Sequence, residues 1–147
     1  MEKVILGRTG ICVQKNGFGA LPVQRVSLNE AKIILRKAYE NGIQFFDSAR
    51  AYSDSEEKIG LALSDVRENI YISTKTMATT VQAFWEDLET SLKMLKTDYI
   101  DIYQFHNPSF CPKPGDGTGL YEAMLEAKNQ GKIHYIGLTN HGWKVAK

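Results

Sequence analysis

Cysteine and histidine are scarce in this sequence. Its 147 residues include two cysteines, Cys12 and Cys111, and three histidines. The cysteines lie far apart and form no CxxC pair, which argues against a structural zinc site, an iron–sulfur cluster and a disulfide framework. We therefore expect no metal centre, and a protein that resides in the reducing cytoplasm.

The chain also lacks an excess of charge of either sign and any long apolar run. Its 18 Lys and Arg residues nearly balance its 17 Asp and Glu residues, so the charge pattern favours neither a nucleic acid nor a membrane surface as partner. No apolar stretch approaches the ~18 residues that a membrane-spanning helix needs. Residues 1–10 contain no apolar core of an export signal. The sequence predicts a soluble, unexported chain.

The sequence does contain a regular alternation of short apolar stretches and amphipathic segments, over the length of one ordinary domain. The first 14 residues predict a β-hairpin that turns at residues 8–10. A capping box, Ser27-Leu28-Asn29-Glu30, opens the first helix, and Gly42 ends it. The expected strands lie at 16–21, 43–47, 69–75, 99–106 and 133–140, and the expected helices at 27–42, 56–63, 80–95 and 119–131, with a further helix beginning within 142–147.

Strands that alternate with helices in units of roughly 30 residues are typical of right-handed βαβ crossovers and a parallel sheet. The chain shows no repeat, low-complexity segment or linker, so we expect one α/β unit. Residues 107–119 are rich in Pro and Gly and form the one long break. A long loop at the carboxyl end of a strand is more often functional than a domain boundary.

A polar residue ends each of four consecutive predicted strands: Asp47, Lys75, His106 and Asn140. The carboxyl ends of parallel strands open on one side of the sheet, where ligands bind in open α/β sheets and in barrels. We expect these side chains to converge there, with Tyr52 folding back from the next loop. Each residue alone also fits an ordinary role, as a cap, a solvated strand end, a satisfied histidine, a turn former or a packing aromatic. Their joint pattern favours a functional site. Charged residues on the helices, by contrast, are expected to lie on ordinary solvated faces.

Carbonyl reduction is a reaction that uses this combination of groups. Hydride delivery to a C=O carbon leaves negative charge on the oxygen, which requires a proton donor and fixed hydrogen-bond donors. Tyr52 could donate the proton if the Lys75 ammonium lowers its pKa of about 10. Asp47 would keep Lys75 charged and oriented, and His106 could donate an N–H to the same oxygen.

At these residues the sequence resembles the aldo-keto reductases. The matching segments are GFGAL, GIQFFDSARAYSDSEEKIGLAL, YISTKT, LKTDYIDIYQFHNP and GKIHYIGLTNH, in that family's order and approximate spacing. The resemblance implies a (β/α)8 TIM barrel with an N-terminal hairpin, NADPH or NADH as cofactor, and a small carbonyl compound as substrate. It also implies a catalytic tetrad of Asp47, Tyr52, Lys75 and His106. The chain looks most like the bacterial and archaeal branch that often carries a C-terminal ferredoxin-like domain.

The same resemblance implies a set of cofactor-binding residues. Thr139 and Asn140 look like the pair that holds the nicotinamide carboxamide. Ala20 and Leu21 stand where the family's backbone approaches the nicotinamide ring, and Asp47 belongs to the same end of the cofactor.

The chain departs from the family in length. A full barrel takes about 250 residues, whereas residues 1–147 are expected to form its N-terminal portion, with a hairpin at 1–14 and strands one to five within 15–140. Strands six to eight would be missing, together with the residue that stacks on the nicotinamide and the basic residues that grip the adenosine phosphate. We therefore expect the 147-residue chain alone to be inactive and to self-associate through exposed strand edges.

Two other interpretations stay open at this point. The chain could be a non-catalytic module that keeps the aldo-keto reductase scaffold as a dinucleotide sensor or regulatory subunit. It could also be a metal-dependent barrel hydrolase that uses Asp47 and His106. That interpretation is weaker, because His134 and His141 lie outside a ligand cluster and Lys75 disfavours a cation. The complete tetrad favours the reductase.

Overall fold

The structure is a computed structural model that describes residues 2–145. The strands are β1 Lys3–Ile5, β2 Cys12–Gln14, β3 Phe18–Gly19, β4 Phe45–Asp47, β5 Tyr71–Thr76, β6 Ile100–His106 and β7 Ile133–Thr139. The α-helices are α1 Leu28–Glu40, α2 Ser55–Leu63, α3 Val81–Leu95 and α4 Leu120–Asn129, and the 3-10 helices are η1 Leu21–Arg25 and η2 Ser64–Asn69. None of the helices within residues 2–145 is long and apolar enough to cross a bilayer.

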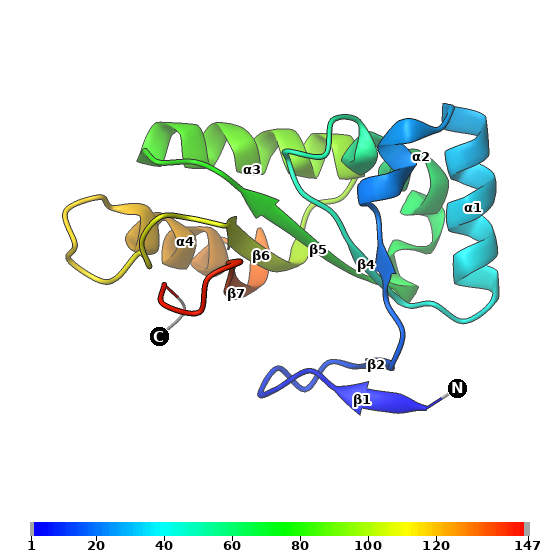
Figure 1. Cartoon of the computed structure of the whole chain (residues 1–147), viewed down its shortest axis with the longest axis horizontal. Coiled ribbons are helices and arrows are strands. Elements are labelled where there is room, and N and C mark those ends of the chain that lie inside the picture. Colours follow the sequence, from blue (N-terminus) through cyan, green and yellow to red (C-terminus); the bar gives the residue numbers. More distant parts are fainter. Residues whose placement is uncertain (1, 146–147) are drawn as a thin grey trace.

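Strands β3 to β7 form one parallel sheet in the order β3-β4-β5-β6-β7, and β1 and β2 pair as an antiparallel hairpin. These pairings confirm the predicted hairpin, the parallel sheet and the alternation of strands with helices. Figure 1 shows the helices along the sheet and the hairpin apart from them at one edge of the molecule. The helix expected within 142–147 is not formed in its described part, since residues 141–145 make bends and turns, and residues 146 and 147 lie outside the described residues.

Helix α1 begins at the predicted capping box. The Ser27 N–H donates to Glu30 Oε2 at 2.9 Å, and the Glu30 N–H donates to Ser27 Oγ at 3.3 Å. These bonds satisfy backbone donors that the first turn of a helix otherwise leaves free. After the helix, Gly42 has a φ of 91°, a left-handed conformation that glycine adopts without steric cost. The chain can therefore turn directly from α1 toward β4.

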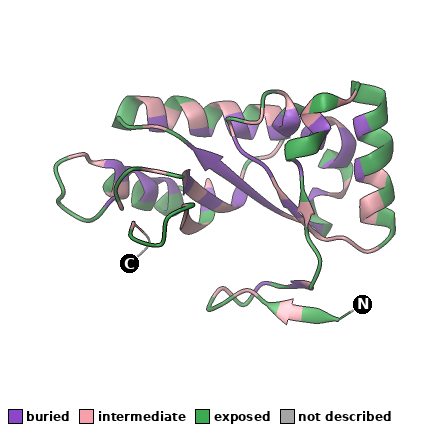
Figure 2. Cartoon of the chain, viewed as in Figure 1, coloured by how far each residue is buried: buried purple, intermediate pink, exposed green. Residues whose placement is uncertain are grey.

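The hydrophobic core lies between the sheet and the helices. Phe46, Ile72 and Tyr103 point to that side from three adjacent strands, and each is at most 2% exposed. They belong to one cluster with Ile59 of α2 and Leu88 of α3. Figure 2 shows that β5, the middle strand, is buried over nearly its whole length, whereas the hairpin is largely exposed. The sheet is thus anchored on one face by helices.

The opposite face of the sheet carries polar side chains toward its carboxyl end. Paired residues of parallel strands lie on the same face, and the register pairs Asp47 with Ser73 and Lys75 with Gln104. Lys75 comes two residues after Ser73, and His106 comes two residues after Gln104. All five therefore share one face, as the predicted alternation along β4, β5 and β6 requires.

Candidate active site

The ammonium group of Lys75, on β5, lies between two oxygens at the end of β4. Its Nζ donates to Asp47 Oδ2 at 2.6 Å and to the backbone oxygen of Ser48 at 2.6 Å. Lys75 is 4% exposed, whereas the Asp47 side chain is 32% exposed. A buried ammonium needs such partners, because desolvation without them costs several kcal/mol. The pair therefore sits at the rim of the buried region.

Tyr52 stands on the loop between β4 and α2, with its ring facing this ion pair. The Tyr52 N–H donates to Ala49 O at 3.0 Å, and the Ser55 N–H donates to Tyr52 O at 2.9 Å. Within the second of these turns, Ser53 has a φ of 51°, a left-handed conformation that is uncommon outside glycine. The loop brings the centre of the Tyr52 ring to 5.2 Å from Lys75 Nζ.

His106 ends β6 and completes the cluster. Its ring meets the Tyr52 ring edge-on, with centroids 5.6 Å apart and an interplanar angle of 87°. Its Nδ1 is buried and has no hydrogen-bond partner within the described part of the chain, so His106 differs from an ordinary core histidine, whose polar atoms are satisfied. The structure thus brings together all four residues of the predicted tetrad, Asp47, Tyr52, Lys75 and His106.

Burial and charge shift two pKa values in the cluster. Burial raises the pKa of Tyr52, and the Asp47 carboxylate raises it further. Burial lowers the pKa of His106, and the Lys75 ammonium lowers it further; Asp47 opposes this shift and His141 adds to it. The expectation that the pKa of Tyr52 is lowered is wrong for this structure. Burial disfavours the charged phenolate, and the Asp47 carboxylate disfavours a second negative charge nearby, so both raise the pKa.

Ala20 and Leu21, two of the predicted cofactor contacts, follow β3 beside Asp47. Ala20 is fully buried; its N–H donates to Asp47 O at 2.8 Å, and its oxygen accepts from Ser55 Oγ at 2.9 Å. Leu21 begins η1 and is 41% exposed. A Cβ built on Gly19 would have no heavy atom within 4 Å. Two hydrogen bonds therefore hold the turn after β3, with open space beside Gly19.

Thr139 and Asn140 lie at the end of β7 in different surroundings. Thr139 pairs with His106 and so shares the polar face of the sheet. Asn140 follows the strand; its Nδ2 donates to Pro108 O at 2.7 Å, and its Oδ1 accepts from the Gly142 N–H at 2.7 Å. Asn140 does reach the carboxyl end of the sheet, but it lies one residue past β7, so strand alternation places only Thr139 on the face of the tetrad. The Asn140 amide is therefore hydrogen-bonded to the loop after β6.

The prediction that charged residues on the helices are solvated is wrong for two residues of α2. Glu56 and Lys58 are 1% and 5% exposed. The helical spacing of the sequence indicates that Glu56 faces the core, because residues three and seven positions further along a helix lie on the same face. Those residues, Ile59 and Leu63, belong to the core. Glu56 is thus a core carboxylate in the first turn of the helix that follows the Tyr52 loop.

Residues 15–147 match the sequence pattern of the aldo/keto reductase family. The chain belongs to this family. It is 33% identical over 143 residues to methylglyoxal reductase DkgA of Yersinia pestis, which covers 95% of this chain and 50% of that protein. A solved aldo-keto reductase from Bacillus halodurans (holo form) gives a TM-score of 0.84 at 29% identity, over 96% of this chain and 51% of that one. An aldo/keto reductase from Klebsiella pneumoniae in complex with NADP and acetate gives a TM-score of 0.78 at 25% identity. That match covers 91% of this chain and 48% of the Klebsiella chain.

This aldo/keto reductase chain spans about half the length of the relatives that it matches. The match confirms the resemblance stated from the sequence and the (β/α)8 barrel class, of which the five-stranded sheet and its helices form a part. The tetrad cluster lies at the carboxyl ends of the strands, the end of such barrels where active sites are found.

A cavity of about 160 Å³ in this aldo/keto reductase chain lies beside His106. Its lining comes mainly from residues 76–79, after β5, and residues 105–110, at and after the end of β6. Met77 and Phe110 in these segments are 62% and 37% exposed. The space next to the tetrad is therefore flanked by apolar side chains that solvent reaches.

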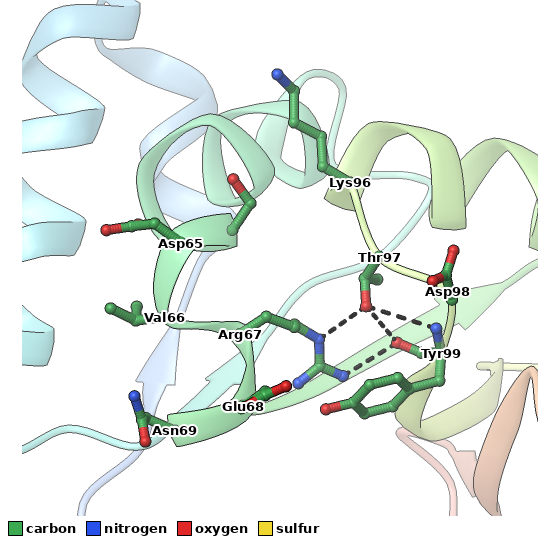
Figure 3. A pocket seen from close by; sticks show the side chains of 10 residues that line it. Asp65, Val66, Arg67, Glu68, Asn69, Lys96, Thr97, Asp98 and Tyr99 are labelled. Carbon is green, nitrogen blue, oxygen red and sulfur yellow. Dashed lines mark hydrogen bonds between the residues drawn. The ribbon is translucent and has the colours of Figure 1, made fainter.

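A second cavity, of about 350 Å³, lies at the amino ends of β5 and β6, away from the tetrad (Figure 3). Arg67 donates there to Thr97 Oγ1 and Tyr99 O, each at 3.0 Å, and to Asp101 Oδ2 at 2.7 Å. Its guanidinium carbon lies 4.0 Å from the centre of the Tyr99 ring. The Arg67 guanidinium therefore makes its contacts within the fold.

Within residues 2–145, no group of three or more His, Cys, Asp or Glu side chains could hold a metal ion.

Proposed function

We propose that this chain is the N-terminal portion of a barrel and carries the catalytic tetrad of an NAD(P)H-dependent oxidoreductase that reduces an aldehyde or ketone to an alcohol. One observation supports this most: Lys75 bonds Asp47 and faces Tyr52, while Tyr52 meets His106 edge-on. The four groups come from three adjacent strand ends and one loop. Such a cluster at the carboxyl end of a parallel sheet is typical of an α/β active site.

In the proposed reaction, Tyr52 donates its hydroxyl proton to the carbonyl oxygen as a hydride reaches the carbonyl carbon. NADPH or NADH supplies that hydride when bound. The raised pKa keeps Tyr52 protonated at neutral pH, as an acid must be. The lowered pKa keeps His106 neutral, with one ring N–H available to the same oxygen. The Asp47–Lys75 pair holds a positive charge beside the phenolate that proton transfer leaves.

The described residues fit the nicotinamide end of such a cofactor in part. Gly19 leaves open space beside Asp47, and Leu21 is exposed there. Asn140 can offer its amide to a carboxamide only by giving up its hydrogen bond to Pro108 O. The proposed cofactor contacts are Ala20, Leu21, Asp47, Thr139 and Asn140.

A small carbonyl compound is the proposed substrate class. The cavity beside His106 has a volume of about 160 Å³, and its neighbours Met77 and Phe110 offer apolar contact without a charge. The similar protein from Yersinia pestis is named a methylglyoxal reductase. Methylglyoxal is therefore the first compound to test, followed by larger aldehydes and ketones.

The oxidation of NADPH by the protein at its native length, measured with a panel of aldehydes, ketones, quinones and methylglyoxal, tests the proposal. Turnover of at least one carbonyl, lost in Tyr52→Phe, is the expected result. Nucleotide binding with no turnover of any carbonyl would contradict it. That outcome would favour the other interpretation, a dinucleotide sensor or regulatory subunit on the same scaffold.

We also propose a cytoplasmic location. Both cysteines are free, and free thiols suit a reducing compartment. Fractionation of the source cells tests this, and recovery of the protein outside the cytoplasmic fraction would contradict it.

A further inference from the structure

Glu56 is a buried carboxylate that accepts from three donors. Its side chain is 1% exposed. Its Oε1 accepts from Thr74 Oγ1 on β5 at 2.6 Å and from Ser91 Oγ on α3 at 2.8 Å, and its Oε2 forms an ion pair with Arg50 Nη1. A charge is kept in a core only where partners offset the cost of desolvation. Glu56 therefore ties the first turn of α2 to a strand, a helix and the loop before it.

Arg50 connects Glu56 to the strand that carries Lys75. The Arg50 N–H donates to Lys75 O at 3.0 Å, and the Ser48 N–H donates to Ser73 O at 2.8 Å. These two bonds continue the β4–β5 ladder past the last residue of β4. Arg50 is thus held twice, by its backbone to β5 and by its guanidinium to Glu56.

Tyr52 lies in the short turn between these two anchors. Arg50 precedes it by two residues, and the Ser55 N–H that binds Tyr52 O begins α2. Glu56 is the second residue of that helix. The ion pair between Arg50 and Glu56 therefore closes a loop of a few residues with the tyrosine at its middle.

We propose that Glu56 and Arg50 are positioning residues for Tyr52, and that their ion pair holds the tyrosine ring against the other members of the tetrad. The catalytic part of this inference rests on the proposed function. A cross-link between the ends of a short loop restricts the conformations open to it, and a displacement of about 1 Å can cost on the order of 10²-fold in rate. Since neither residue needs to touch the substrate, breaking the pair should lower kcat and leave cofactor binding nearly unchanged.

The test compares Glu56→Gln with Arg50→Lys in the protein at its native length. Glutamine keeps an oxygen for the two hydroxyl donors but has no charge for Arg50, whose side chain is 23% exposed and can turn to solvent. Lysine at position 50 keeps a cation within reach of Glu56. In Glu56→Gln we expect amide hydrogen exchange in residues 48–55 to rise by about tenfold or more, and kcat to fall by about 10- to 100-fold. The Kd for NADPH should change by less than about twofold, and Arg50→Lys should behave nearly as the wild type.

Asp101→Asn is the matched control, because it breaks another buried ion pair at the opposite end of the sheet. The Arg67 and Asp101 side chains are 8% and 7% exposed, and their N···O distance is 2.7 Å. Figure 3 shows Arg67 at that end. Asp101→Asn should lower Tm as Glu56→Gln does. Below the unfolding transition it should leave kcat and the exchange of residues 48–55 near their wild-type values.

Two results would overturn the inference. One is unchanged exchange in residues 48–55 of Glu56→Gln, and the other is equal loosening of that segment in Asp101→Asn, which would indicate general instability. If Glu56→Gln does not fold, the double variant E56Q with R50M removes both charges and gives the same readouts. Exchange does not depend on turnover, so it decides the positioning role even if Tyr52→Phe retains activity and the proposed function fails.

Discussion

At the scale of single residues, Lys75 shows how a charge is kept in a largely buried position. Its ammonium donates hydrogen bonds to Asp47 and to the backbone oxygen of Ser48, at the end of the neighbouring strand β4. Asp47 is about a third exposed, so breaking the pair costs less than the roughly 3–5 kcal/mol that is typical of a fully buried one. The same ammonium lies 5.2 Å from the Tyr52 ring. It also lowers the pKa of His106.

Tyr52→Phe should remove the proton donor without disturbing the fold. The hydroxyl makes no hydrogen bond to any described residue, so its loss leaves no group unsatisfied. We expect the catalytic rate to fall by about 10²–10⁴-fold and the affinity for NADPH to change little. Steady-state kinetics at saturating cofactor measure this. A rate within a few-fold of wild type would rule out Tyr52 as the acid.

Lys75→Met should raise the pKa of both Tyr52 and His106. The ammonium lowers the pKa of His106, and its loss leaves the Asp47 carboxylate, which raises the pKa of both groups, without its counter-charge. Because Tyr52 must be protonated to act as an acid, the alkaline limb of the pH–rate profile for reduction should move to higher pH. Asp47→Asn removes the carboxylate that raises the pKa of Tyr52 and of His106, so it should lower both values. An NMR titration in which His106 does not respond to Lys75→Met would contradict this.

At the scale of elements, helices α2 and α3 contact each other at Gly60 of α2, which has no side chain. A Cβ on Gly60 of α2 would lie 2.2 Å from Met94 O and 2.8 Å from the Leu95 carbonyl carbon. Both atoms belong to the backbone of α3 and cannot rotate away. The glycine therefore sets the distance between two helices that cover the sheet behind the tetrad.

Gly60→Ala should destabilise the protein although alanine is the better helix former. The gain in helix propensity is about 1 kcal/mol. Overpacking costs about 1–3 kcal/mol and occasionally more, and a 2.2 Å approach to a backbone atom places Gly60→Ala at the upper end of that range. Gly19→Ala is the matched control, because no heavy atom lies within 4 Å of its Cβ position. Urea unfolding at a constant m-value measures both. Equal midpoints for the two variants would show that α2 and α3 can separate at little cost.

At the scale of the whole molecule, the parallel sheet has two edges. Within the described residues, β3 pairs only with β4, and β7 pairs only with β6. Edge strands present unpaired N–H and C=O groups that can bind another strand. A closed barrel has no such edges, so the five-stranded unit differs from a complete barrel in how it can associate.

The polypeptide of residues 1–147 is expected to self-associate and to bind NADPH weakly. Its open edges favour pairing with a second copy, and contacts to the adenosine phosphate, worth about 1.5–3 kcal/mol for each charged hydrogen bond, are not expected from this chain. Light scattering and the fluorescence of NADPH measure the two properties. A stable monomer of 16.5 kDa that binds NADPH at micromolar concentration would contradict this and indicate a self-sufficient fold.

Much of the architecture followed from local patterns in the sequence. The capping box at Ser27, the left-handed turn at Gly42 and the five apolar stretches depend on contacts between near neighbours, which propensity and periodicity describe well. Strand alternation then placed Asp47, Lys75 and His106 on one face, because a strand repeats every two residues. Strand alternation was less useful for Asn140, because that residue follows the last residue of β7.

Other features were decided only by tertiary structure. The pKa of Tyr52 is raised, not lowered, because burial of its side chain and the Asp47 carboxylate both raise it. The core position of Glu56 depends on Arg50, from its own loop, and on hydroxyls from β5 and α3. The sequence by itself determined the fold class and predicted the four residues proposed as the tetrad, because strand period and residue type are local. Burial, charge pairing and loop anchoring join residues distant along the chain, so they exist only once it has folded.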